Sequence, residues 1–158
     1  MKEIKPAERI SHVEEYYFSR ILKEVAKMNA DGGLPVISLG IGGPDFMPSQ
    51  QTIFALIDDV MKSDAHSYQP YVGLPALRKA WSDFYKRWYD VDADPAKEMI
   101  PLIGSKEGIM HVSMAFLNPG DKVLVPDPGY PTYTSASKMV EAEIVTYDLK
   151  EENHWWPD

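Results

Sequence analysis

The sequence has no cysteine among its 158 residues. Disulfide bonds, thiolate catalysis and zinc sites with cysteine ligands are therefore excluded. It also lacks any apolar run long enough for a signal peptide or a membrane span. Basic residues are outnumbered, since 16 Lys and Arg stand against 24 Asp and Glu for a net charge of -8. With no basic tract, we expect no nucleic acid and no membrane among the partners, and a cytoplasmic location.

Several common ligand-binding motifs are also missing. No GxxxxGK[ST] sequence is present, so a P-loop is excluded. Residues 40–45 contain GxGG, but Pro44 and Asp45 then break the dinucleotide pattern GxGxxG. A calcium loop would need glycine at Pro95 and glutamate at Pro101. The three acids that mimic the start of such a loop are Asp90, Asp92 and Asp94. The four histidines have no ligand spacing and no serine has an evident His–Asp partnership, so we expect neither a metal site nor a hydrolase triad.

Short apolar stretches alternate with helical patterns along the chain. We expect strands at residues 36–39, 100–103, 123–125 and 144–147, and helices at residues 13–28, 53–61, 75–88, 105–117 and 132–141. This alternation predicts an α/β fold in which a helix connects parallel strands by a right-handed crossover, as between the strands at 100–103 and 123–125. The helix at 105–117 is apolar on most sides, so we expect it to be buried.

The turn Gly104-Ser105-Lys106 is the most informative stretch for function. An apolar strand is predicted to end at Gly104 and a helix to begin at Ser105, whose first amides have no partners within the helix. Such amides, with the helix dipole, a hydroxyl and a lysine, favour an anion such as phosphate. The alternative is an ordinary strand-to-helix turn in which Ser105 is the N-cap.

Four segments in order give the sequence a family resemblance. They are VISLGIGGPDF at 36–46, YQPYVGLPALRKA at 68–80, LIGSKEGI at 102–109 and DKVLVPDPGYPTY at 121–133. Together they resemble the amino-terminal part of class I/II, fold-type I, pyridoxal-phosphate-dependent aminotransferases. The branch that contains LL-diaminopimelate, alanine and aspartate aminotransferases looks most similar. The resemblance implies an enzyme of amino-acid metabolism that transfers an amino group from an amino acid to a 2-oxo acid through pyridoxal 5'-phosphate.

The implied architecture is a three-layer α/β/α fold, of which only the amino-terminal arm and part of the large domain are expected here. Residues 1–45 would form the arm, a helix and the first strand on the side of the small domain. Residues 46–158 would form the first part of the large cofactor-binding domain.

The resemblance also assigns cofactor-binding residues. Ser105 and Lys106 fall where the family binds the cofactor phosphate. Tyr130 falls where an aromatic ring stacks on the pyridine ring. Tyr68 falls where a tyrosine reaches the phosphate in the neighbouring subunit, which implies a homodimer with shared active sites.

Two residues fall at substrate positions. Gly42 matches a glycine whose backbone lies close to the substrate carboxylate, and Tyr16, or the adjacent Tyr17, matches an amino-terminal tyrosine that reaches substrate. Gly43 departs from the family, in which an acidic residue is common at this position. No lysine here matches the one that forms the Schiff base with the cofactor, so we expect no catalytic residue in this chain. We therefore expect a fragment that is inactive by itself.

Two alternatives remain open. Enzymes of the same fold carry out lyase or cyclopropane-forming chemistry with the same cofactor. A non-catalytic, truncated binding module is the other possibility. The sequence does not identify the amino acid or the 2-oxo acid.

Overall fold

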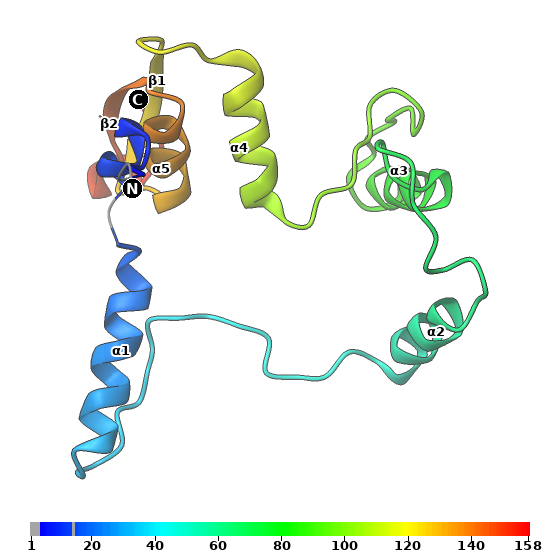
Figure 1. The fold of residues 1–158 in the computed structure, drawn as a ribbon, viewed down its shortest axis with the longest axis horizontal. Helices are drawn as coiled ribbons and strands as arrows, with labels where there is room; N and C mark the ends of the chain where they lie inside the picture. The colour runs from blue at the N-terminus through cyan, green and yellow to red at the C-terminus, as the bar shows by residue number, and fades with distance from the viewer. Residues whose placement is uncertain (1–3, 14) are drawn as a thin grey trace. The chain divides into compact units, whose positions relative to one another are not determined.

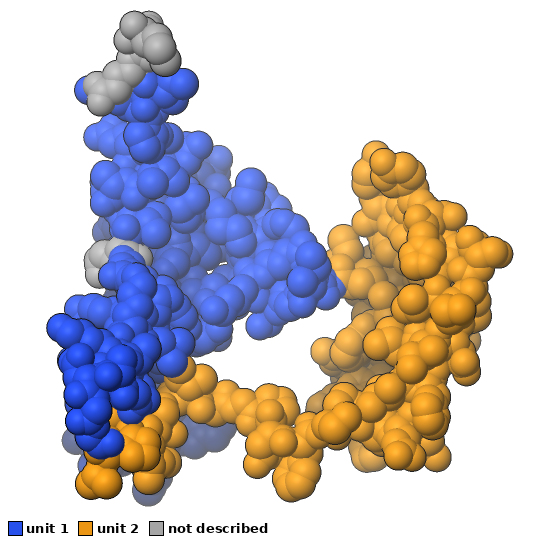
Figure 2. All heavy atoms as spheres, turned by 60° about the horizontal axis from the view of Figure 1, so that its bottom comes forward, with its two compact units in different colours: residues 1–33, 102–158 blue, residues 34–101 orange. Residues whose placement is uncertain are grey.

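The structure is a computed structural model that describes residues 4–13 and 15–158. Contacts between residues divide the chain into two compact units (Figure 2). The first, here called the sheet unit, comprises residues 1–33 and 102–158. The second, the helical unit, comprises residues 34–101. The predicted domains, 1–45 and 46–158, remain a prediction.

The sheet unit contains two parallel strands, β1 (Lys122–Asp127) and β2 (Glu143–Asp148) (Figure 1). Their register pairs Lys122 with Glu143 at one end and Asp127 with Asp148 at the other. Helix α5 (Pro131–Met139) connects the strands and packs against both of them. These are the predicted strands at 123–125 and 144–147 and the predicted helix at 132–141, each with slightly different ends.

The core of the sheet unit lies where β1 meets α5. Val125 on β1 is 2% exposed, and Ala136 and Ser137 on α5 are 4% and 2% exposed. The Ser137 hydroxyl donates to the backbone carbonyl of Tyr133 at 2.8 Å, which satisfies a polar group that would be costly to bury alone.

Four further elements complete the sheet unit. They are η1 (Glu8–His12), α1 (Tyr17–Ala30), α4 (Ser105–Phe116) and η2 (Glu151–Asn153). Both η1 and α4 pack against α5. The predictions of helices at 13–28 and 105–117 are confirmed, apart from their exact ends.

The helical unit contains α2 (Gln50–Val60) and α3 (Pro75–Tyr89), close to the predicted helices at 53–61 and 75–88. The Ser49 side chain caps α2 by accepting from the Thr52 amide at 3.2 Å. Pro75 occupies the first turn of α3, where its missing N–H costs little. Gly73 precedes α3 at φ +80°, and an added Cβ there would lie 2.6 Å from Pro101 Cγ.

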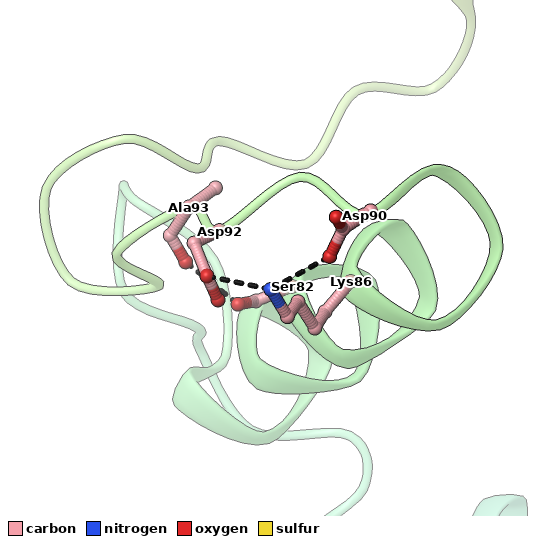
Figure 3. Close-up of polar contacts among 5 residues, drawn as sticks. All are labelled: Ser82, Lys86, Asp90, Asp92 and Ala93. Carbon is pink, nitrogen blue, oxygen red and sulfur yellow. Dashed lines mark hydrogen bonds and ion pairs between the residues drawn. The ribbon is translucent and has the colours of Figure 1, made fainter.

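Polar contacts fold the loop after α3 back onto that helix (Figure 3). Lys86 Nζ lies 2.8 Å from Asp90 Oδ1 and 2.7 Å from Asp92 Oδ2. These hydrogen bonds, to Asp90 and then Asp92, raise the pKa of Lys86. The Ser82 hydroxyl donates to the Ala93 carbonyl at 2.6 Å. Two of the acids that resemble a calcium loop are thus paired with a lysine.

The described residues form neither a metal-binding cluster nor a helix that could span a membrane. No cluster of three or more histidine, aspartate or glutamate side chains in the described ranges could hold a metal ion. None of the described helices is long and apolar enough to cross a bilayer.

Two predicted strands are wrong, at residues 36–39 and 100–103. A strand requires a neighbour with which to exchange backbone hydrogen bonds. In the described part of the chain the only such pairing joins β1 and β2. The crossover therefore runs through α5 and not, as predicted, through the helix at 105–117.

The burial predicted for α4 is also wrong. No residue of this helix is buried, and Val112, Met114 and Phe116 are 59%, 62% and 77% exposed. The helix is apolar on most sides, but burial requires another element to cover each face. In the described residues α5 is the element that packs on α4, and it leaves much of the helix surface uncovered.

Candidate cofactor-phosphate site

The N-terminus of α4 has free amides and open space beside it. Gly104 is the N-cap, with extended backbone at φ 176° and ψ 169°, and no side chain caps the helix. An added Cβ on Gly104 would meet no heavy atom within 4 Å. Ser105 is therefore the first helical residue and not the N-cap, so the alternative of an ordinary serine cap is wrong. The Glu107 amide donates to the Gly104 carbonyl at 3.2 Å, and the amides of Ser105 and Lys106 remain available to an anion.

Lys106 lies between two aromatic rings at this helix end. Its Nζ is 4.9 Å from the ring centroid of Tyr16 and 5.6 Å from that of Tyr130. These are cation–π distances. The structure thus brings together three of the six predicted site residues, and Ser105 adjoins them in sequence. We call Tyr16, Ser105, Lys106 and Tyr130 the α4 cluster.

The contacts within the cluster shift the pKa values of Lys106 and Tyr130. A hydrogen bond with Tyr130, its negative charge when ionised and that of Tyr16 raise the pKa of Lys106. The pKa of Tyr130 is lowered, first by a hydrogen bond with Thr132 and then by the hydrogen bond and charge of Lys106. Lys106 is therefore a firmly protonated cation at neutral pH, and its positive charge is available to an anion.

The turn after β1 fixes the position of Tyr130. Gly129 approaches the preceding backbone so closely that an added Cβ would lie 2.2 Å from the Pro126 carbonyl oxygen. Tyr130 is then the N-cap of α5, whose first residue is Pro131. Its ring meets that of Tyr133 edge to face, with centroids 5.8 Å apart. The ring is therefore held at the carboxyl end of a parallel strand, where α/β sheets usually bind ligands.

Tyr68 and Gly42 belong to the helical unit and are not part of the α4 cluster. The Tyr68 side chain is fully exposed. An added Cβ on Gly42 would meet no heavy atom within 4 Å, so its backbone is open to close approach. The roles suggested for these two residues remain predictions.

Two residues near the α4 cluster were not predicted from the sequence. Glu107 Oε2 accepts from the Ile103 amide at 2.6 Å, and Thr132 bonds Tyr130. A glutamate three residues after the N-cap is a known capping pattern, so Glu107 could have been found from its spacing. No comparable signal marks Thr132.

The donors of the α4 cluster fit a phosphate beside a flat ring. Ser105 offers a hydroxyl, Lys106 an ammonium group, and both residues their backbone amides, all of which suit a phosphate dianion. Tyr130 adds an aromatic face on which a heteroaromatic ring can stack. The described residues therefore fit a phosphorylated aromatic cofactor.

Comparisons with known proteins agree with this geometry. The family model described as aminotransferase class I and II matches residues 35–158. An LL-diaminopimelate aminotransferase from Halothermothrix orenii is 42% identical over 152 residues, which is 96% of this chain and 39% of the relative. The chain thus spans about two fifths of the length of this curated relative.

Two solved structures give the same result. The apo-BacF structure from Bacillus subtilis superposes with a TM-score of 0.88 at 37% identity, covering 99% of this chain and 40% of that one. An alanine aminotransferase from Pyrococcus furiosus gives 0.85 at 32% identity, with 98% and 39% covered. The α/β, fold-type I architecture expected from the sequence is confirmed.

Proposed function

Because this chain belongs to the class I and II aminotransferase family, we propose that the whole protein transfers an amino group from an amino acid to a 2-oxo acid with pyridoxal phosphate as cofactor. Enzymes of this family use that cofactor in general. The observation that carries the proposal is the α4 cluster, in which Lys106 Nζ lies 4.9 Å from the Tyr16 ring centroid and 5.6 Å from that of Tyr130. The cation and the helix amides match the phosphate of the cofactor, and the aromatic face matches its ring.

In this proposal Ser105 and Lys106 bind the phosphate. The Ser105 hydroxyl and the first amides of α4 donate hydrogen bonds, and Lys106 contributes a full charge. The positive end of the helix dipole adds to this attraction. Phosphate binding at this point anchors the cofactor away from the reacting atoms.

Tyr130 orients the other end of the cofactor by stacking against its ring. The bound cofactor supplies an electron-withdrawing ring that lets a proton leave the α-carbon of the amino acid. Tyr130 keeps that ring in one plane and shields one of its faces from water. No lysine in this chain is assigned to the Schiff base with the cofactor, so the residues described here bind and orient.

Gly42 and Tyr16 are proposed to contact the substrate, the first through its backbone and the second through its ring or hydroxyl. The name of the Halothermothrix orenii relative suggests LL-diaminopimelate as the amino donor. Tyr68 is proposed to reach the phosphate in a second subunit, which would make the active protein a homodimer. The full exposure of its side chain leaves it available for such a contact. A cytoplasmic location also remains a prediction.

The function is tested with the whole purified protein. We expect it to bind pyridoxal phosphate and to convert a 2-oxo acid to an amino acid when LL-diaminopimelate, alanine or aspartate is supplied as donor. Products are identified by mass spectrometry. If the protein released ammonia from the amino acid when no 2-oxo acid was supplied, its reaction would be that of a lyase and not an aminotransferase. A protein that neither binds the cofactor nor transfers an amino group would overturn it.

A further inference from the structure

Glu107 lies in the first turn of α4, where a carboxylate could either compete with a bound phosphate or help to shape its site. Its Oε2 accepts a hydrogen bond from the Ile103 amide at 2.6 Å. The side chain therefore reaches back past Gly104 to the residue before the helix. A carboxylate held in this way does not occupy the amides of Ser105 and Lys106 itself.

The segment before α4 has few other constraints. The Ile103 side chain is 99% exposed, so burial does not hold it in place. Leu102 is held better, because its side chain packs closely against Gly108. A Cβ added to Gly108 would lie only 2.6 Å from Leu102 Cδ1. Gly104 has open space on its Cβ side. Two hydrogen bonds therefore fix the backbone next to the Ser105 and Lys106 amides. The Gly104 carbonyl accepts from the Glu107 amide at 3.2 Å, and the Glu107 carboxylate accepts from the Ile103 amide at 2.6 Å.

We infer that Glu107 is a positioning residue for the phosphate site, because its carboxylate holds the Ile103–Gly104 backbone so that the Ser105 and Lys106 amides face one anion. This inference rests on the proposed function. Preorganised donors bind an anion more tightly than donors that must first be ordered. The Glu107 carboxylate repels a bound phosphate, but this repulsion is offset because its hydrogen bond holds the turn in the conformation that binds the anion.

Asp121 provides a matched control in the turn that follows α4. Its Oδ2 accepts from the Asn118 amide at 2.6 Å, the same kind of bond over the same distance. It also accepts from the Asn118 side chain at 3.2 Å. Loss of either carboxylate should lower thermal stability, but only loss of Glu107 should weaken phosphate binding.

The test titrates the purified protein with inorganic phosphate and follows the backbone amide signals of Ser105 and Lys106 by NMR. Inorganic phosphate is the probe because the aldehyde of pyridoxal phosphate reacts with exposed lysines in general. Glu107→Ala should weaken binding roughly 3- to 10-fold, the range expected from one lost hydrogen bond. Glu107→Gln keeps an acceptor oxygen and should bind at least as tightly as the unaltered protein. Asp121→Ala should bind like the unaltered protein.

A second readout follows hydrogen exchange at the Ile103 amide. Exchange should speed up in Glu107→Ala and stay slow in Glu107→Gln. Unchanged phosphate affinity in Glu107→Ala, or equal tightening in both Glu107 variants, would overturn the inference while leaving the proposed function intact. If phosphate fails to shift the Ser105 signal of the unaltered protein, the phosphate site itself is wrong, and the role assigned to Glu107 falls with it.

Discussion

The sheet unit and the helical unit hold their residues by different kinds of contact. In the sheet unit, paired residues of β1 and β2 lie 21 positions apart in the sequence, as Lys122 and Glu143 do, and α5 packs against both strands. In the helical unit, the polar contacts of α3 join the helix to the loop that follows it, as Lys86 does with Asp90. Tyr16, Lys106 and Tyr130 come from distant segments of the sequence and meet in the sheet unit.

The comparison indicates where a substitution should matter most. Long-range packing fixes the turn that carries Tyr130, so damage there should reach the proposed phosphate site. The exposed ion pairs of the helical unit contribute little, because solvent and salt screen them.

The largest effect is expected from a charge in the small core of the sheet unit. Val125→Asp buries a carboxylate where β1 meets α5 and should destabilise the protein by about 3 kcal/mol or more. Leu124→Asp is the control, because this neighbour is 71% exposed and on the other face of β1. Urea denaturation measures both variants. Equal losses of stability would show that the core is not where we place it.

A smaller loss is expected from Gly129→Ala. The new Cβ would meet the Pro126 carbonyl oxygen at 2.2 Å, so the turn before Tyr130 must move. We expect a loss of roughly 1–3 kcal/mol in stability together with weaker phosphate binding. Gly43→Ala, in the helical unit, has no heavy atom within 4 Å of the new Cβ and should change neither quantity. Thermal denaturation and the phosphate titration distinguish the two variants.

Removal of the cation in the α4 cluster should act on binding rather than stability. Lys106→Met should weaken phosphate binding and raise the pKa of Tyr130, since Lys106 is one of the groups that lower it. The Thr132 contact remains, so the pKa should rise only part of the way to its ordinary value. NMR of ring-labelled tyrosine measures this pKa. An unchanged value would mean that Lys106 does not approach Tyr130 in solution.

The pH dependence of phosphate binding follows from the same pair. Lys106 has a raised pKa, so its charge is fully present at neutral pH and is lost only as pH rises through that raised value. Tyr130, with a lowered pKa, becomes negative at a lower pH than an ordinary tyrosine. Phosphate affinity should therefore start to fall at a pH below the ordinary pKa of tyrosine, as Tyr130 ionises, before Lys106 is deprotonated. Affinity that stays constant through this range would contradict the arrangement.

The smallest effect is expected in the helical unit. Lys86→Met removes two exposed ion pairs, at 2.8 and 2.7 Å, and should lower Tm slightly at low salt and hardly at all at high salt. Lys79→Met removes the pair with Asp83 and should have an even smaller effect. A large loss of Tm from Lys86→Met would mean that the loop after α3 depends on this lysine more than its exposure suggests.

Local patterns in the sequence predicted the helices well. Pro75 marks the start of α3, and the apolar spacing of residues 53–61 marks α2. The strands at 123–125 and 144–147 were found because each is a short apolar run after a turn. Those at 36–39 and 100–103 look the same in sequence, and nothing local tells whether a partner strand will be present.

The candidate site was predicted only in part, because local patterns are visible in the sequence and tertiary contacts are not. Ser105 and Lys106 lie at a recognisable turn, and Tyr130 follows a recognisable strand. The resemblance to a family, and not periodicity, linked them with Tyr16. The contact of Lys106 with both rings depends on tertiary packing, and so does the bond between Glu107 and Ile103, although its spacing was visible.

The most direct test of the proposed site is a crystal structure of the whole protein grown with pyridoxal phosphate. We predict that the phosphate contacts Ser105 and Lys106 at the N-terminus of α4 and that the Tyr130 ring stacks on the cofactor ring. A cofactor phosphate bound at another part of the protein, or a Tyr130 ring that makes no contact with the cofactor, would contradict the account.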